Sequence, residues 1–135
     1  MKLELIEYVK VNLPAGFLPY SIYSIIIEDK EVGRIILREG SDQECYYDGH
    51  IGYHIDEEYR GHHYAVQACL LLKEVIDKDH LLITCDPTNI ASIKTIEELG
   101  CEYLETKIIP QHLKKLFASD ECEKMIYRWN IRSEE

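Results

Sequence analysis

The sequence lacks any uninterrupted apolar run that could cross a bilayer, and its first residues do not form a signal peptide. Residues 1–5 alternate apolar and charged side chains. Proline and glycine are also scarce, at 4 and 7 residues, and no Pro/Gly/Ser-rich linker divides the chain. We therefore expect a cytoplasmic protein with no membrane partner, forming a single domain over residues 1–135.

Basic residues are few relative to acidic ones. The chain has 15 Lys and Arg against 25 Asp and Glu, which gives a formal net charge of −10. Nucleic-acid binding normally requires a basic surface, so this balance argues against DNA or RNA as the principal partner. An acidic surface concentrates cationic ligands such as amines, although it also simply keeps a protein in solution.

Paired cysteines and standard metal motifs are missing as well. The five cysteines are odd in number and never form a Cys-x-x-Cys pair, so we expect reduced, mostly buried thiols. Four of the six histidines lie between positions 50 and 63, which raises the alternative of a metal-dependent protein. Their spacing matches no standard zinc arrangement, and we predict no metal.

The first half of the chain has the alternation and β-branched composition of strands. A charged turn at Glu28–Lys30 indicates a hairpin, and a Pro/Gly turn is expected at Pro14–Gly16. The expected strands are Lys2–Val11, Tyr20–Glu28, Glu31–Leu37 and Glu44–Ile55.

The apolar period changes to that of a helix after Gly61. A second helix is expected from Thr88-Asn89 to the terminating glycine at position 100, and a short one at 111–117. Strands are expected at Leu81–Cys85, Cys101–Ile109 and Lys124–Ile131, followed by a frayed tail at Ser133–Glu135. This order predicts an α/β (α+β) fold: a mixed, mostly antiparallel sheet of about six to seven strands with helices on its faces.

One candidate site is the junction where the strand ending near Ile55 leads through a polar turn into the first helix. The start of a helix presents unpaired backbone N–H groups and the positive end of the helix dipole, which together attract anions. Gly61 allows close approach of a ligand, and Arg60 adds a fixed positive charge. The residues alone fit either a pyrophosphate site or an ordinary strand-to-helix turn.

A second candidate site is the start of the second helix. Here Asn89 and Ser92 form an Asn-x-x-Ser pattern that ends in Leu99-Gly100. Asn89 is also a favourable helix cap, and the capping role is compatible with a role in binding.

Together the two segments resemble the GNAT superfamily of N-acetyltransferases, in the ribosomal-protein N-acetyltransferase-like branch. The first is similar to the Gln/Arg-x-x-Gly-x-Gly/Ala signature: Arg60 and Ala65 match its ends, while His63 stands in place of the central glycine. The second is similar to the family's Asn-x-x-Ser…Glu-x-Leu-Gly-Phe element, with Cys101 in place of Phe. The resemblance covers Gly49–Glu105 well and the rest only by strand pattern.

The resemblance implies a GNAT fold with a shortened N-terminal helical region, acetyl-CoA as co-substrate, and transfer of its acetyl group to a primary amine by direct attack in a ternary complex. It implies that Asn89 contacts the pantetheine arm. It also places Ser92 at the thioester sulfur as the acid, because the position of the family's usual tyrosine holds Ile96. The cofactor-binding residues implied are Tyr53, His54, Ile55, Arg60, Gly61, His62, His63, Tyr64, Ala65, Asn89 and Ser92.

The amine must lose a proton, and histidine titrates in the right range for a base. We predict His50 as the base, with His54 and Asp48 as alternatives. His50 and His54 differ by an even number, so on one strand they would share a face.

The acceptor site is less defined by the sequence. Only Asn12–Pro19 separates the first two strands, where the family commonly has two helices, so a more open cleft is expected. That cleft could be completed by a partner subunit, as in a homodimer, or by a large substrate. Tyr20, Tyr23, Tyr46, Tyr47 and Trp129 are the aromatic residues that could line it. The alternative function is a non-catalytic CoA-binding or interaction module that retains the fold.

Overall fold

The computed structural model describes residues 1–11, 13 and 18–132, so the expected Pro14–Gly16 turn and the tail from Ser133 lie outside the described residues. The strands are β1 (Lys2–Val9), β2 (Tyr20–Ile27), β3 (Lys30–Arg38), β4 (Ile51–Ile55), β5 (His80–Cys85), β6 (Glu102–Ile108) and β7 (Glu123–Asn130). The α-helices are α1 (Tyr64–Lys73) and α2 (Ile90–Glu98), and 3₁₀ helices span Glu57–Tyr59 and Gln111–Leu116.

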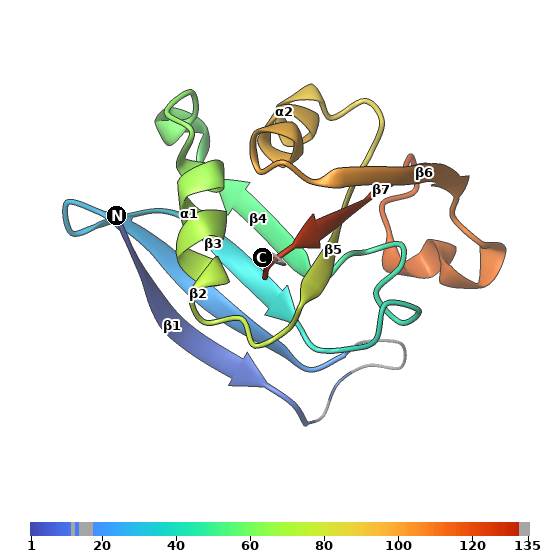
Figure 1. Ribbon diagram of the computed structural model, residues 1–135, viewed down its shortest axis with the longest axis horizontal. Helices are drawn as coiled ribbons and strands as arrows, with labels where there is room; N and C mark the ends of the chain where they lie inside the picture. Colours follow the sequence, from blue (N-terminus) through green and yellow to red (C-terminus); the bar gives the residue numbers. More distant parts are fainter. Residues whose placement is uncertain (12, 14–17, 133–135) are drawn as a thin grey trace.

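The strands divide between two antiparallel sheets, with orders β1-β2-β3-β4 and β5-β7-β6. Figure 1 shows α1 in front of the first sheet and α2 beside the second. The predicted α+β class and its antiparallel pairing are confirmed. None of the helices in the described part of the chain is long and apolar enough to cross a membrane.

The β2–β3 hairpin turns at Glu28 and Asp29, which both have positive φ, at 48° and 66°. Two such residues in succession are typical of the tight turns that match the twist of paired strands. The hairpin presents two different faces. Ile25 and Ile35 are fully buried on the core side, whereas Tyr20 pairs with Arg38 on the other.

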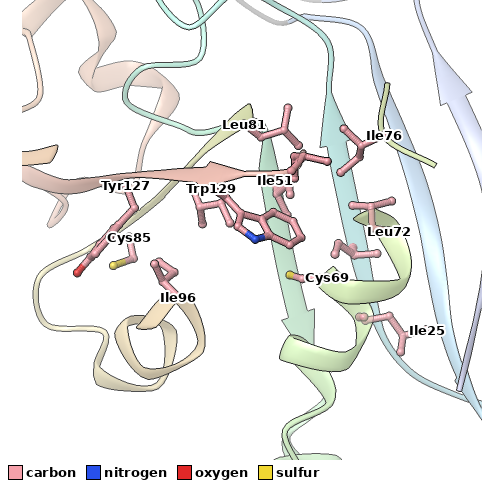
Figure 2. Packing of buried hydrophobic residues seen from close by; sticks show 14 of the residues in the cluster. Ile25, Ile51, Cys69, Leu72, Ile76, Leu81, Cys85, Ile96, Tyr127 and Trp129 are labelled. Atoms are coloured by element: carbon pink, nitrogen blue, oxygen red, sulfur yellow. The ribbon is translucent and has the colours of Figure 1, made fainter. Parts of the chain in front are cut away.

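The core lies between the first sheet, α1 and the second sheet. Cys69 and Leu72 of α1 are fully buried, one helical turn apart. Trp129 of β7 is also buried, and Figure 2 shows its indole among the residues of β4, β5 and α1. The same view shows Ile96 of α2 beside Cys85 and Tyr127. These contacts fix α1 and α2 against adjoining parts of one core.

The two sheets meet at the start of β4 and β5. The amide of His50 donates to the carbonyl of Leu82 over 2.8 Å, and within the described residues β4 and β5 belong to different sheets. Gly49 has a φ of 76°, and a Cβ at this position would lie 3.1 Å from the Thr84 nitrogen. Only glycine allows so close an approach in this conformation. Past this junction the two strands are free to separate.

The expected strand Glu44–Ile55 is wrong in its first half. Residues 42–48 form turns, and the strand begins at Ile51. The chain turns because local hydrogen bonds satisfy its backbone: Cys45 N to Ser41 O and Gly49 N to Cys45 O. Burial of the Cys45 side chain then holds this loop on the molecule.

Candidate active site

A groove of 420 Å³ opens between the end of β4, the turn before α1, and α2. It gathers both segments that the sequence singled out. Its lining residues are Tyr53, His54, Ile55, Tyr59, Arg60, Gly61, His63, Tyr64, Ala65, Asn89, Ala91, Ser92, Lys94, Thr95 and Glu98.

The start of α1 forms one wall of the groove. Gly61 has a φ of 91°, which reverses the chain after the 3₁₀ helix. Helical bonding begins with Gln67 N to His63 O over 3.2 Å, so the amides of residues 64–66 have no helical carbonyl to bond. These amides and the helix dipole make this wall suitable for an anion.

His63 directly precedes α1 in the left-handed conformation, with φ 58° and ψ 28°. This backbone conformation favours glycine, the residue that the family signature has here. The imidazole lines the groove, and its Nδ1 lies 3.1 Å from a carboxylate oxygen of Glu98. His63 therefore links the start of α1 to α2 across the groove.

Arg60 and His62 have different positions. Arg60 lines the groove, and its Nε donates to the carbonyl of Ile55 over 2.9 Å, which anchors the guanidinium at the end of β4. His62 is absent from the groove lining. Its ring stacks on Tyr64 with centroids 5.2 Å apart, and its carbonyl accepts from Gln67.

Helix α2 forms the opposite wall. Asn89 caps it: its side-chain oxygen accepts from the Ser92 amide over 3.1 Å. Three further residues of α2 line the groove: Lys94, Thr95 and Glu98. Neither sequence motif indicated them. They continue from Ala91 at the i, i+3, i+4, i+7 spacing of one helical face, and this spacing was the signal that could have found them.

The hydroxyl of Tyr53 meets that of Ser92 inside the groove, with 2.8 Å between the two oxygens. Burial raises the pKa of Tyr53 to about 12, and the Ser92 hydroxyl opposes this rise. Burial raises the pKa of the nearby Cys85 thiol, an effect that the Ser92 hydroxyl opposes. Ser92 thus lies between β4 and the end of β5.

His50 lies outside the groove, at the junction of the two sheets, where its side chain is only 1% exposed. Its Nδ1 accepts from the Leu82 amide over 3.0 Å, so the ring proton belongs on Nε2, 2.9 Å from the Gly40 carbonyl. Burial lowers the pKa of His50. With both nitrogens bonded inside the protein, this geometry argues against the predicted base. His50 and His54 were expected to share one face of a strand. This does not hold, because β4 begins only at Ile51.

His54 does line the groove, although its side chain is 66% exposed. Its Nε2 lies 3.7 Å from a carboxylate oxygen of Asp56. The third candidate, Asp48, lies in a different cavity.

The second cavity, of 460 Å³, is lined by Leu18, Tyr20, Ile22, Ile36, Arg38, Asp48, Leu116, Phe117, Glu121 and Lys124. Its charged groups are paired: Arg38 with Asp48 at 3.7 Å, and Lys124 with Glu121 at 2.6 Å. Burial raises the pKa of the Asp48 carboxyl, against the opposing effect of Arg38.

The two cavities lie on opposite faces of β4. A Cβ at Gly52 would lie 3.4 Å from the Arg38 guanidinium, on the side of the second cavity. The next residue, Tyr53, points into the groove, as alternation along a strand requires. Of the aromatic residues expected at the acceptor cleft, Tyr20 lines the second cavity and Trp129 is buried in the core.

Among the residues that the structure describes, no group of three His, Cys, Asp or Glu side chains gathers as a metal site would. The five cysteines are free thiols, three of them buried.

Comparison with solved structures finds acetyltransferases of the same fold. RimL, a ribosomal L7/L12 alpha-N-protein acetyltransferase, has a TM-score of 0.66 and 16% identity over 85% of this chain and 72% of its own. The Salmonella typhimurium acetyl transferase that modifies the N-terminal serine of L7/L12 has a TM-score of 0.66 and 17% identity, over 84% and 64%. The microcin C7 self-immunity acetyltransferase MccE, solved with acetyl-CoA and AMP, has a TM-score of 0.62 and 16% identity, over 82% and 61%. This chain therefore spans less than two thirds of the second and third of these proteins.

Sequence comparison gives the family directly. No curated protein matches the chain by sequence. The model of the acetyltransferase (GNAT) domain matches residues 6–102, across both segments that form the groove. The chain therefore belongs to the GNAT acetyltransferase family, as its two motifs predicted.

Proposed function

We propose that this protein is an N-acetyltransferase that moves an acetyl group from acetyl-CoA to a primary amine. The observation that carries the proposal is the groove itself. It places the unpaired amides at the start of α1 opposite Asn89 and Ser92 of α2. An anion site and a pair of thioester-facing polar groups are what a bound acyl-CoA needs.

In this proposal the CoA pyrophosphate binds the amides of residues 64–66, with Arg60 and Lys94 supplying positive charge. The pantetheine arm runs between β4 and α2, where Asn89 contacts it. The thioester then lies beside Ser92, whose hydroxyl donates a hydrogen bond to the sulfur. Backbone amides of residues 53–55 are the candidate donors to the carbonyl oxygen.

The acceptor amine enters through the second cavity and reaches the thioester where β4 and β5 separate. Its apolar wall suits the body of a substrate, and the Asp48 carboxyl offers a proton acceptor. Because burial raises the pKa of Asp48, this carboxyl is a better base than an ordinary aspartate. We propose Asp48 in this role in place of His50. By analogy with the Salmonella typhimurium protein, the proposed acceptor is a peptide N-terminus, positively charged before it loses its proton.

We further propose that residues 1–135 act as one domain, in the cytoplasm, where free thiols persist. Assembly as a homodimer would enclose the open acceptor side.

Thermal unfolding with increasing CoA tests the binding half of the proposal. CoA should raise the melting temperature with concentration, because a ligand that binds only the folded state stabilises it. AMP, which lacks the pantetheine arm and the pyrophosphate, is the matched control and should shift it far less. No shift at millimolar CoA would contradict the proposed site.

Release of free CoA thiol from acetyl-CoA tests catalysis. A peptide with a free N-terminal serine should accelerate release, and the same peptide already acetylated at its N-terminus should not. Binding of CoA without release across a wide amine panel would instead favour the non-catalytic CoA-binding module.

A further inference from the structure

The Tyr53–Ser92 contact joins a strand to a helix inside the groove. Tyr53 reaches across from β4, and its hydroxyl oxygen lies 2.8 Å from that of Ser92 near the start of α2. Thr95, one turn further along α2, lines the groove on the same side of the helix. This phenol is thus held by the one helix face that lines the groove.

Ser92 needs such a partner in order to act on a ligand. Its amide is fixed by Asn89, but a serine hydroxyl can rotate among several directions. A phenol that donates to the Ser92 oxygen leaves the serine hydrogen free to point elsewhere. Within α2, Ile96 is fully buried and supplies no polar group. Tyr53 is therefore the side chain placed to set the direction of the Ser92 hydroxyl.

We propose that Tyr53 is a positioning residue, which donates to the Ser92 oxygen and turns the Ser92 hydrogen toward the thioester sulfur. This inference rests on the proposed function. In the reaction, the amine nitrogen forms a bond to the acetyl carbon and the carbon–sulfur bond breaks. The electron pair leaves on sulfur, where the Ser92 hydroxyl stabilises it by a hydrogen bond. The amine proton passes through Asp48 to water, and the CoA thiolate takes a proton from solvent.

The ionisation of Tyr53 agrees with this role. With a pKa of about 12, the phenol keeps its proton throughout the neutral range. It therefore remains a hydrogen-bond donor and does not itself transfer a proton.

A double-mutant cycle tests the coupling. Tyr53→Phe and Ser92→Ala should each lower kcat about tenfold, the loss of about 1.4 kcal/mol of transition-state stabilisation, with the Kd for CoA unchanged. The double variant should be no slower than Ser92→Ala alone, since Tyr53 acts only through that serine. Tyr103→Phe, on the exposed part of β6, is the control for removal of a phenol hydroxyl. Independent, multiplying losses would show that Tyr53 acts directly and would overturn the proposal, as would a Tyr53→Phe enzyme with full kcat.

A measurement without turnover separates this inference from the proposed function. In protein with ¹³C at the tyrosine Cζ, the signal that disappears in Tyr53→Phe belongs to Tyr53. That signal should move in Ser92→Ala and should move again when CoA binds to the wild type. A protein that never acetylates an amine but shows these shifts would lose the proposed function and keep the coupled pair. A Tyr53 signal unmoved by Ser92→Ala would reject the pair in either case.

Discussion

The net charge of the groove depends on a few individual side chains. Its backbone amides do not depend on residue type, so they are the same whatever side chains line the groove. Arg60 and Lys94 bring positive charge, whereas Glu98 brings a carboxylate into a place proposed for phosphates. Its contact with His63 at 3.1 Å offsets that charge only when the imidazole is protonated. The electrostatics of CoA binding therefore depend on Lys94 and Glu98 as well as on the signature residues Arg60 and His63.

Glu98→Gln should tighten CoA binding about threefold, the equivalent of about 0.7 kcal/mol for an exposed charge interaction. The gain should shrink as salt screens the groove. Glu97→Gln is the matched control: it removes the same charge from the same helix, but Glu97 does not line the groove. Isothermal titration of both variants at two salt concentrations measures the difference. Equal effects from the two would place the phosphates elsewhere.

Asp48→Asn should lower kcat/KM for the amine by at least about tenfold while CoA binding stays unchanged. Burial raises the Asp48 pKa above its ordinary value of 3.8. Wild-type activity should therefore rise with pH as Asp48 loses its proton, in a range above that of a free aspartate. This rise of activity with pH should be absent from the variant. Asp120→Asn changes an exposed carboxylate outside the cavity and should keep both the rate and its rise with pH.

At the scale of elements, α2 is the part that connects stability to binding. Asn89 caps the helix, Ser92 and Lys94 face the groove, and Ile96 anchors the helix in the core beside Tyr127. The same short segment thus supplies a cap, a wall of the site and a core contact. A change at its N-cap, Asn89, should affect both folding and ligand affinity.

Asn89→Ala should lower the free energy of unfolding by about 1 kcal/mol, since the Ser92 amide loses its cap. It should also weaken CoA binding. Asn89→Asp keeps an oxygen that can cap, so its stability in urea should match the wild type. If both variants unfolded alike, the cap would not contribute measurably.

At the scale of the whole molecule, His50 joins the two sheets. Its amide, Nδ1 and Nε2 bond Leu82 on β5 and the carbonyl of Gly40, where β4 and β5 begin to diverge. The groove lies beyond that divergence. His50, which the sequence suggested as a base, is therefore placed to hold the two sheets together next to the groove.

His50→Leu should lower the free energy of unfolding by about 1–3 kcal/mol, because the buried Leu82 amide loses its acceptor. The wild type should also lose stability as pH falls below 6.5, the ordinary pKa of histidine. The folded-state pKa of His50 is lowered, so the unfolded chain takes up the proton first and is favoured in acid. Urea unfolding between pH 5 and 8 measures both effects. His112→Leu, at an exposed site, is the control. It should change the free energy of unfolding by no more than about 0.5 kcal/mol at any pH in this range.

The elements whose pattern is local can be predicted from the sequence alone. The β2–β3 hairpin, both α-helices, the Asn89 cap and the family follow from alternation, turn residues and motif spacing, which act between near neighbours. The separation of the two sheets could not be predicted in this way, because His50 and Leu82 are far apart in sequence. The same holds for the Tyr53–Ser92 contact and the second cavity, which bring together side chains from distant strands and loops. Periodicity assigns a residue to a face, but the partner of that face depends on how the whole chain packs.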